Sequence, residues 1–185
     1  KLQETLKFET VLNKMSYYRY FIKLAYNGAR YHGWQVQQNA VTVQEVVSNA
    51  ARLILNDDVK ITGCGRTDTG VHASQYFAHF DLEEPLSVEE TDNIAFKLNR
   101  YLPEDIVIYK IFAVSPGLHS RFDPLSRTYE YHIHTRKDPF LNDLSWFFHQ
   151  PLDIGLMNRG GEIITEYEDF TSFSKAIEKR KTNLC

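Results

Sequence analysis

Two amphipathic helix patterns most strongly constrain the fold. Each begins with the same capping signal, and each lies between two runs with strand character. Thr42 and Glu45 open the first pattern, and Ser87 and Glu90 open the second. At this spacing an N-cap hydroxyl and a Glu three residues later can satisfy the first backbone amides of a helix. Apolar residues then recur at helical spacing in both segments: Val43, Val46, Val47, Ala50 and Ile54, then Ile94, Leu98 and Leu102. We therefore predict one helix after Thr42 and another after Ser87.

Strand patterns flank both predicted helices. Residues 17–26 alternate apolar and polar side chains, and residues 59–65 and 74–81 have strand character on either side of a glycine-rich loop. Residues 105–114 are apolar on both faces, which predicts an interior strand. The resulting order, β-α-β-β-α-β, is the split arrangement of ferredoxin-like domains, so we predict an α+β fold with a mixed or antiparallel sheet and helices on one face.

The rest of the chain divides into an extension and a second unit. Residues 1–16 are polar and form an N-terminal extension, and residues 17–115 form the ferredoxin-like subdomain. Residues 116–185 start a second α/β subdomain, with a strand at 127–135, a weaker one at 145–149 and a helix from about Asp153. One strand pair and one helix do not close a core, so we expect the second subdomain to be incomplete at its C-terminus.

The composition argues against a membrane protein and a disulfide-rich protein, but it does not identify the binding partner. No apolar run is long enough to span a membrane, and two cysteines cannot form a disulfide framework, so a cytoplasmic protein without a membrane partner is expected. The formal charge is −3, yet residues 81–92 hold six acids and no Lys or Arg, which leaves the remaining residues net positive. A basic face for nucleic acid is therefore compatible with this charge. The many Tyr and Phe residues fit either core packing or stacking platforms for bases.

The stretch GCGRTDTGVHA, residues 63–73, fails the common templates for a glycine-rich loop. A phosphate-binding P-loop would need glycine at Lys60 and lysine at Arg66, and a dinucleotide fingerprint would need glycine at Asp68. The histidines near it and further on have no metal-ligand spacing: His72, His79, His132 and His134. What remains is Arg66-x-Asp68 on a turn between two strands. It is either an ordinary turn or a pair of charged side chains that project to one side toward a ligand.

This stretch closely resembles the signature G-R-T-D-x-G-V-H-A of the TruA family of tRNA pseudouridine synthases, matched from Gly65 to Ala73. Four further stretches resemble the family in the same order: LAYNGARYHGWQVQQN (24–39), TVQE (42–45), HSRFDPLSRTYEYHI (119–133) and DFTSF (169–173). Members of the family continue beyond DFTSF with a further sheet-and-helix segment. The resemblance therefore implies a C-terminally shortened member, with an RNA-binding cleft between its two halves.

The resemblance also implies roles for individual residues. It makes Asp68 the catalytic carboxylate, Arg66 the residue that helps flip the uridine out of the RNA, and Tyr129 in RTYEY the ring that stacks on the flipped uracil. We expect Tyr129, Tyr131 and Ile133 to share the apolar face of the strand 127–135, and Tyr129 could equally be a core residue. Asp68 could attack C1′ of the ribose or abstract a sugar proton, and the sequence leaves both routes open.

Weaker tRNA contacts are expected from side chains of the first loop and from basic residues elsewhere, although each could equally be an ordinary surface residue: Arg30, His32, Trp34, Gln35, Gln38, His79, Arg121, Arg127 and Arg136. The resemblance implies modification of uridines at positions 38, 39 and 40 in the anticodon stem-loop of tRNA, no cofactor or metal, and a homodimer. A non-catalytic RNA-binding module and an unrelated ferredoxin-like interaction domain are the alternative functions.

Overall fold

The computed structural model describes residues 17–173, which form two compact units. The first unit ends at Thr128 and the second begins at Tyr129. The expected extension 1–16 and the last part of the expected second subdomain lie outside the described residues.

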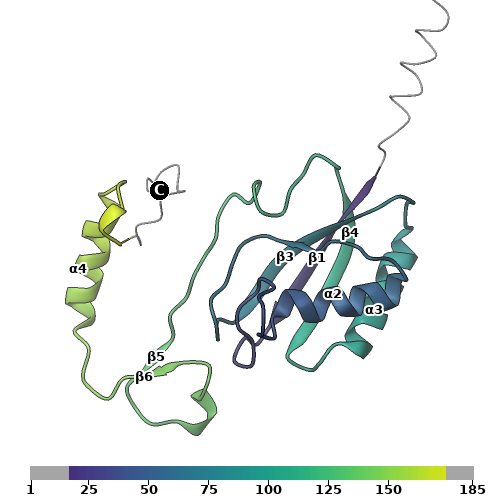
Figure 1. Cartoon of the computed structure of the whole chain (residues 1–185). Coiled ribbons are helices and arrows are strands. Elements are labelled where there is room, and N and C mark those ends of the chain that lie inside the picture. Colours follow the sequence, from purple (N-terminus) through teal and green to yellow (C-terminus); the bar gives the residue numbers. More distant parts are fainter. Residues whose placement is uncertain (1–16, 174–185) are drawn as a thin grey trace, which may run out of the picture. The chain divides into compact units, whose positions relative to one another are not determined.

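A four-stranded antiparallel sheet forms the centre of the first unit (Figure 1). Its strands are β1 (Tyr18–Tyr26), β2 (Thr62–Gly63), β3 (Ala73–Leu82) and β4 (Ile106–Val114), in the spatial order β2-β3-β1-β4. The central strand β1 pairs antiparallel with both β3 and β4, and β2 pairs antiparallel with β3. With a helix after β1 and another after β3, this is the predicted split β-α-β-β-α-β arrangement, and the α+β prediction is confirmed.

Both predicted helices form where their caps place them. Helix α2 (Val43–Leu55) begins at Thr42, whose hydroxyl accepts a hydrogen bond from the Glu45 amide. Helix α3 (Val88–Tyr101) has the complete capping box, in which the Ser87 hydroxyl accepts from the Glu90 amide and the Glu90 carboxylate accepts from the Ser87 amide. The two helices contact each other and lie over the same face of the sheet (Figure 1).

The core lies between that sheet face and the two helices. Alternate residues of β1 and β3 are buried together with the inward positions of α2 and α3, as the period of two in a strand and of 3.6 in a helix requires. Members of this core include these: Tyr20, Ile22, Leu24, Tyr76, Phe80, Val43, Val47, Ile94 and Leu98. Burial of this apolar area fixes the loops at the ends of the strands.

Two expectations about strands in the first unit are wrong. The segment 105–114 was expected to be interior, but β4 is an edge strand, and its Tyr109 and Lys110 are exposed. A strand whose two faces are largely apolar need not have a neighbour on each side. The strand expected over 59–65 is limited to Thr62–Gly63 because only these residues pair with β3.

The second unit has little regular structure among residues 129–173. Its strands β5 (Ile133–His134) and β6 (Trp146–Phe147) form one short parallel pair, followed by α4 (Ile154–Thr165). Short 3₁₀ helices occupy Pro139–Leu141 and Thr171–Phe173. The long strand expected over 127–135 is therefore wrong except at its end, since only Ile133 and His134 find strand partners. The helix expected from Asp153 forms, with Asp153 as its N-cap, and it continues through Gly160 and Gly161.

Residues 115–128 pack with the first unit. The Ser120 hydroxyl donates to the Thr62 carbonyl (2.9 Å) and lies 2.7 Å from Nδ1 of His79. The Arg127 guanidinium donates to the Cys64 carbonyl at 2.8 Å. These bonds explain why the first compact unit extends to Thr128, whereas the sequence places a subdomain boundary after residue 115. None of the described helices is long and apolar enough to cross a membrane.

Candidate active-site loop

The Arg66-x-Asp68 segment belongs to the loop of residues 64–72 between β2 and β3. Residues 66–68 are in neither helix nor strand, and the loop then turns at Gly70, whose φ of +80° is the left-handed conformation that favours glycine. The Val71 amide donates to the Asp68 carbonyl at 3.2 Å and closes this turn. The predicted turn between two strands is therefore present.

Both charged side chains of the loop reach solvent. Arg66 and Asp68 are exposed, and within residues 17–173 neither side chain forms a hydrogen bond or an ion pair. The Asp68 carboxylate therefore does not cap nearby backbone amides, as it would in an ordinary Asx turn. Both groups are available to a ligand that approaches the loop.

The first loop, residues 27–41, holds the backbone of the active-site loop by direct hydrogen bonds. The Gly70 amide donates to the Tyr31 carbonyl (3.2 Å), and the Trp34 amide donates to the Thr67 carbonyl (3.3 Å). The Gly28 amide donates to Nδ1 of His72 (3.1 Å). Backbone bonds on both sides of Asp68 thus fix the loop although the Asp68 side chain is free.

Two glycines of the first loop permit this close approach. A side chain at Gly28 would overlap the Val71 carbonyl, and one at Gly33 would overlap the Thr67 carbonyl. Gly33 also has a φ of +80°, a conformation that other residues rarely adopt. The glycines of this segment therefore serve backbone packing between two loops.

A cluster of three aromatic side chains lies at the base of the loop: Tyr26, Trp34 and Tyr76, all buried. The rings of Trp34 and Tyr76 have centroids 4.3 Å apart, and those of Tyr26 and Tyr76 are 5.6 Å apart. The Tyr76 hydroxyl bonds to the Gly65 backbone, and the Tyr26 hydroxyl lies 3.0 Å from Oγ1 of Thr67. We call these three residues the aromatic base. Tyr76 has no signal in the sequence, because no motif marks a strand residue that bonds to a loop.

Two residues expected to contact tRNA are buried instead. Trp34 belongs to the aromatic base and is 2% exposed. His79 is 4% exposed and bonds to Ser120. Burial, followed by the nearby Arg19 guanidinium, lowers the pKa of His79 to about 4, so that its imidazole is neutral at pH 7. Neither side chain offers the surface that a phosphate or base contact needs.

The other expected contacts of the first loop are exposed. His32, Gln35 and Gln38 lie at the surface, in the same loop that holds the active-site loop. The Arg30 guanidinium pairs with Asp105 at 2.6 Å, and that carboxylate also accepts from the Tyr31 hydroxyl. Arg30 is thereby anchored to the start of β4 while its side chain remains largely exposed.

Of the expected contacts between residues 119 and 136, Arg127 touches the active-site loop. Its guanidinium donates to the carbonyls of Cys64 (2.8 Å) and Arg121 (2.7 Å). Arg121 is itself exposed in the first unit, and Arg136 is exposed in the second. Arg127 therefore links the 115–128 segment to the residue that begins the loop.

Tyr129 is the first residue of the second unit and is 63% exposed. The expectation that Tyr129 and Tyr131 lie on the apolar face of a strand is wrong, because both are exposed and neither is in a strand. A core role for Tyr129 is excluded in this structure. Its stacking on uracil stays a prediction.

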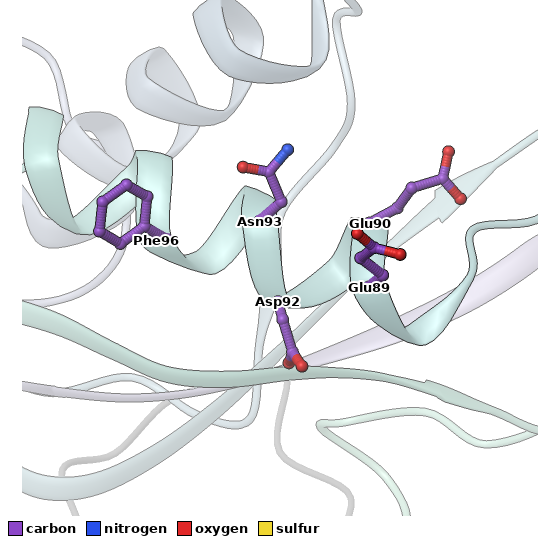
Figure 2. Close-up of a pocket in the computed structure, with 5 residues that line it drawn as sticks. All are labelled: Glu89, Glu90, Asp92, Asn93 and Phe96. Atoms are coloured by element: carbon purple, nitrogen blue, oxygen red, sulfur yellow. The ribbon is translucent and has the colours of Figure 1, made fainter.

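Helix α3 carries a hollow whose lining differs in chemistry from this loop. The hollow is shallow and is lined by Glu89, Glu90, Asp92, Asn93 and Phe96, all on that one helix (Figure 2). Three carboxylates repel phosphate, so this face suits no nucleic-acid backbone. Among the described residues, no group of three or more His, Cys, Asp or Glu side chains could hold a metal ion.

Fold and site together define a class: a ferredoxin-like domain that presents an exposed arginine and aspartate between two strands. Among curated proteins, the chain is 50% identical to a tRNA pseudouridine synthase A of Bacteroides fragilis over 172 residues, which cover 92% of this chain and 67% of that relative. It is 48% identical to that of Parabacteroides distasonis over 167 residues (90% and 66%) and 36% identical to that of Thermoanaerobacter pseudethanolicus over 164 residues (88% and 66%).

The chain belongs to the tRNA pseudouridine synthase A family. No family model matches it. The chain spans about two thirds of the length of these relatives.

Proposed function

We propose that the protein isomerises uridine to pseudouridine in tRNA, with Asp68 as the catalytic carboxylate. The observation that carries this proposal is the exposed, unpaired Asp68 beside Arg66 on a loop whose backbone is fixed on both sides. Membership of the family supplies the reaction and the substrate class. A reaction at a buried sugar carbon requires a carboxylate that is positioned before the substrate arrives. A loop with a fixed backbone and a free carboxylate meets this requirement.

The reaction balances without any added reactant except water. The N1–C1′ bond of uridine breaks, the uracil turns, a C5–C1′ bond forms, the proton on C5 leaves to solvent, and N1 takes up a proton from solvent. Asp68 acts at the ribose, either as a nucleophile at C1′ or as the base that removes a sugar proton. Both routes need an ionised carboxylate within reach of the sugar.

Arg66 and Tyr129 serve the extraction of the base in this proposal. Flipping a nucleotide out of an RNA helix costs a few kcal/mol. A guanidinium next to Asp68 offsets this cost by entering the vacated stack or pairing with the displaced phosphate. Stacking of the uracil on Tyr129 contributes about 1–3 kcal/mol. The exposure of both side chains supports these roles.

The finer features of the substrate and assembly follow from the family resemblance. We propose that the modified uridines are those at positions 38, 39 and 40 of the anticodon stem-loop. The exposed polar side chains that remain as candidate tRNA contacts are Arg30, His32, Gln35, Gln38, Arg121, Arg127 and Arg136. We also propose a homodimer in the cytoplasm, where tRNA is modified.

Release of tritium from tRNA labelled at C5 of uracil tests this function, because the C5–C1′ bond replaces the C5–H bond. The full-length protein is expected to release tritium, and Asp68→Ala is expected to abolish release. Asp92→Ala, an exposed aspartate on α3, is the matched control and is expected to leave the rate unchanged. Full-length protein that binds tRNA with the salt dependence of phosphate contacts but releases no tritium would instead support the non-catalytic RNA-binding module.

A further inference from the structure

We infer that Tyr76 is a positioning residue for the active-site loop, holding the backbone directly before Arg66 through its buried hydroxyl. The inference rests on the proposed function of Asp68 for its kinetic consequence. The geometry on which it is based, however, is independent of the reaction. Tyr76 forms no hydrogen bond with Arg66 or Asp68 within residues 17–173; it acts through the Gly65 backbone, and its hydroxyl also interacts with the Cys64 side chain.

The hydroxyl of Tyr76 satisfies both backbone groups of one loop residue. It donates to the Gly65 carbonyl at 2.5 Å and accepts from the Gly65 amide at 3.3 Å. Gly65 directly precedes Arg66, and Tyr76 is 4% exposed. A single side chain in β3 therefore fixes the point at which the chain leaves the sheet for the active site.

The other two rings of the aromatic base and the backbone of β2 pack around the Tyr76 ring. The Trp34 ring packs against it on one side and the Tyr26 ring contacts it edge-on. A side chain at Gly63 would overlap both the Trp34 indole and the Tyr76 hydroxyl, so the backbone of β2 closes the remaining space. Burial raises the pKa of the Tyr76 hydroxyl above its ordinary value, which keeps it a hydrogen-bond donor.

The consequence for Asp68 follows from the lack of side-chain partners. Within residues 17–173 the Asp68 carboxylate forms no bond of its own, so its position depends on the loop backbone. A displacement of about 1 Å at a reacting group can lower a rate by about 10²-fold. Loss of the Tyr76 hydroxyl is therefore expected to displace the loop backbone and so to lower the turnover rate.

Tyr76→Phe in the full-length protein is the test, and Tyr20→Phe is its matched control. Tyr20 is equally buried, stacks on Phe80, and accepts a hydrogen bond from the Leu86 amide at 2.6 Å, away from the active-site loop. The two variants each lose one buried hydroxyl that binds backbone. Tritium release gives kcat and KM, and hydrogen–deuterium exchange without tRNA reports the amides of residues 64–71.

We expect Tyr76→Phe to lower kcat about 10-fold or more, with KM within about 2-fold of wild type, and to speed amide exchange in the loop. Tyr20→Phe is expected to change neither. Tyr26→Phe, which removes the contact with Thr67, is expected to shift exchange in the same direction as Tyr76→Phe and to a smaller extent.

Equal kcat and equal loop exchange in Tyr76→Phe and Tyr20→Phe would overturn the inference. Failure of the proposed function has a different signature, because the unchanged full-length protein would then release no tritium. In that case the loop exchange of the two variants still decides whether Tyr76 positions the loop.

Discussion

Some charged side chains of the first unit form ion pairs or hydrogen bonds within the fold, and others do not. Arg19 pairs with Asp81, Arg30 with Asp105, and Arg127 with two backbone carbonyls. Arg66 and Asp68 have no such partner within residues 17–173. Charged groups that the fold leaves unpaired on a fixed loop can act on a ligand without first breaking an internal bond.

Arg66→Ala is expected to slow tritium release more when the target uridine is base-paired than when it is mismatched. On tRNA with a paired target uridine, we expect tritium release to slow by about 10²-fold, since flipping costs a few kcal/mol. A mismatch opposite that uridine lowers the cost, so the variant should recover part of its rate there. Initial rates on the two tRNAs measure this difference.

Arg52→Ala serves as the control for that experiment, because Arg52 is exposed on α2 and pairs with Asp58. It should release tritium at the wild-type rate from both tRNAs. An Arg66→Ala defect of the same size on paired and mismatched substrates would mean that Arg66 does not act in base flipping.

At the scale of elements, the sequence pattern predicts the order of helices and strands along the chain. It predicts less well which strands lie next to each other in the sheet. Caps and periodicity predicted α2 and α3, and the β-α-β-β-α-β order implied the observed sheet. The edge position of β4 was missed because an apolar pattern reports burial of faces and not hydrogen-bonded neighbours. Tyr129, Tyr131 and Ile133 alternate as a strand would, yet only Ile133 has a strand partner in residues 129–173.

The candidate site shows the same limit of prediction. Arg66 and Asp68 were found from a motif, since both lie within a few residues of each other in the sequence. The side chains that support them carry no such motif: Tyr76 reaches back to Gly65 from the strand that follows the loop, and Arg127 reaches Cys64 from 63 residues further along the chain. Trp34 carries an aromatic face suited to RNA, and only the packing against Tyr76 shows that this face is used internally.

Gly33→Ala is expected to disturb the contact between the first loop and the active-site loop. The added methyl group meets the Thr67 carbonyl, and the φ of +80° is strained for alanine. We expect the free energy of unfolding to fall by about 1–3 kcal/mol, together with a loss of turnover. Urea denaturation and tritium release measure the two effects.

Gly160→Ala is the control with the opposite sign. Gly160 is inside α4, and apart from its chain neighbours and the backbone of its own helix no described atom lies within 4 Å of the position of its added methyl group. The substitution is expected to stabilise the helix by about 0.5–1 kcal/mol. If Gly33→Ala behaves like Gly160→Ala, the close approach of the two loops is not a constraint on this protein.

The contact between β3 and the 115–128 segment predicts a pH dependence of stability. The pKa of His79 is about 4 in the folded protein and about 6.5 in an unfolded chain. As pH falls below about 6.5, the unfolded chain gains a proton that the folded protein does not, so stability falls until about pH 4. Unfolding of wild type and His79→Gln, followed across this range, should show a shallower decline in the variant.

His32→Gln, which alters an exposed histidine, is the control and should keep the wild-type decline. A His79→Gln protein whose stability falls as steeply as that of wild type between pH 6.5 and pH 4 would show that His79 is not buried in its neutral form.

On the scale of the whole molecule, the proposed activity combines residues from both compact units. Arg66 and Asp68 belong to the first, and Tyr129 and Arg136 belong to the second. The chain covers about two thirds of its relatives' length, so assays of turnover belong on the full-length protein. Family membership gives the class of reaction, and the first unit shows how its loop is held.

The most direct test of the central claim compares full-length wild type, Asp68→Asn and Asp92→Asn for release of tritium from C5 of uracil in tRNA. Asparagine at position 68 keeps the shape of the side chain and removes its charge. We predict that wild type and Asp92→Asn release tritium at the same rate, and that Asp68→Asn is slower by at least about 10²-fold. Asp68→Asn with the wild-type rate of release would contradict the assignment of Asp68 as the catalytic carboxylate.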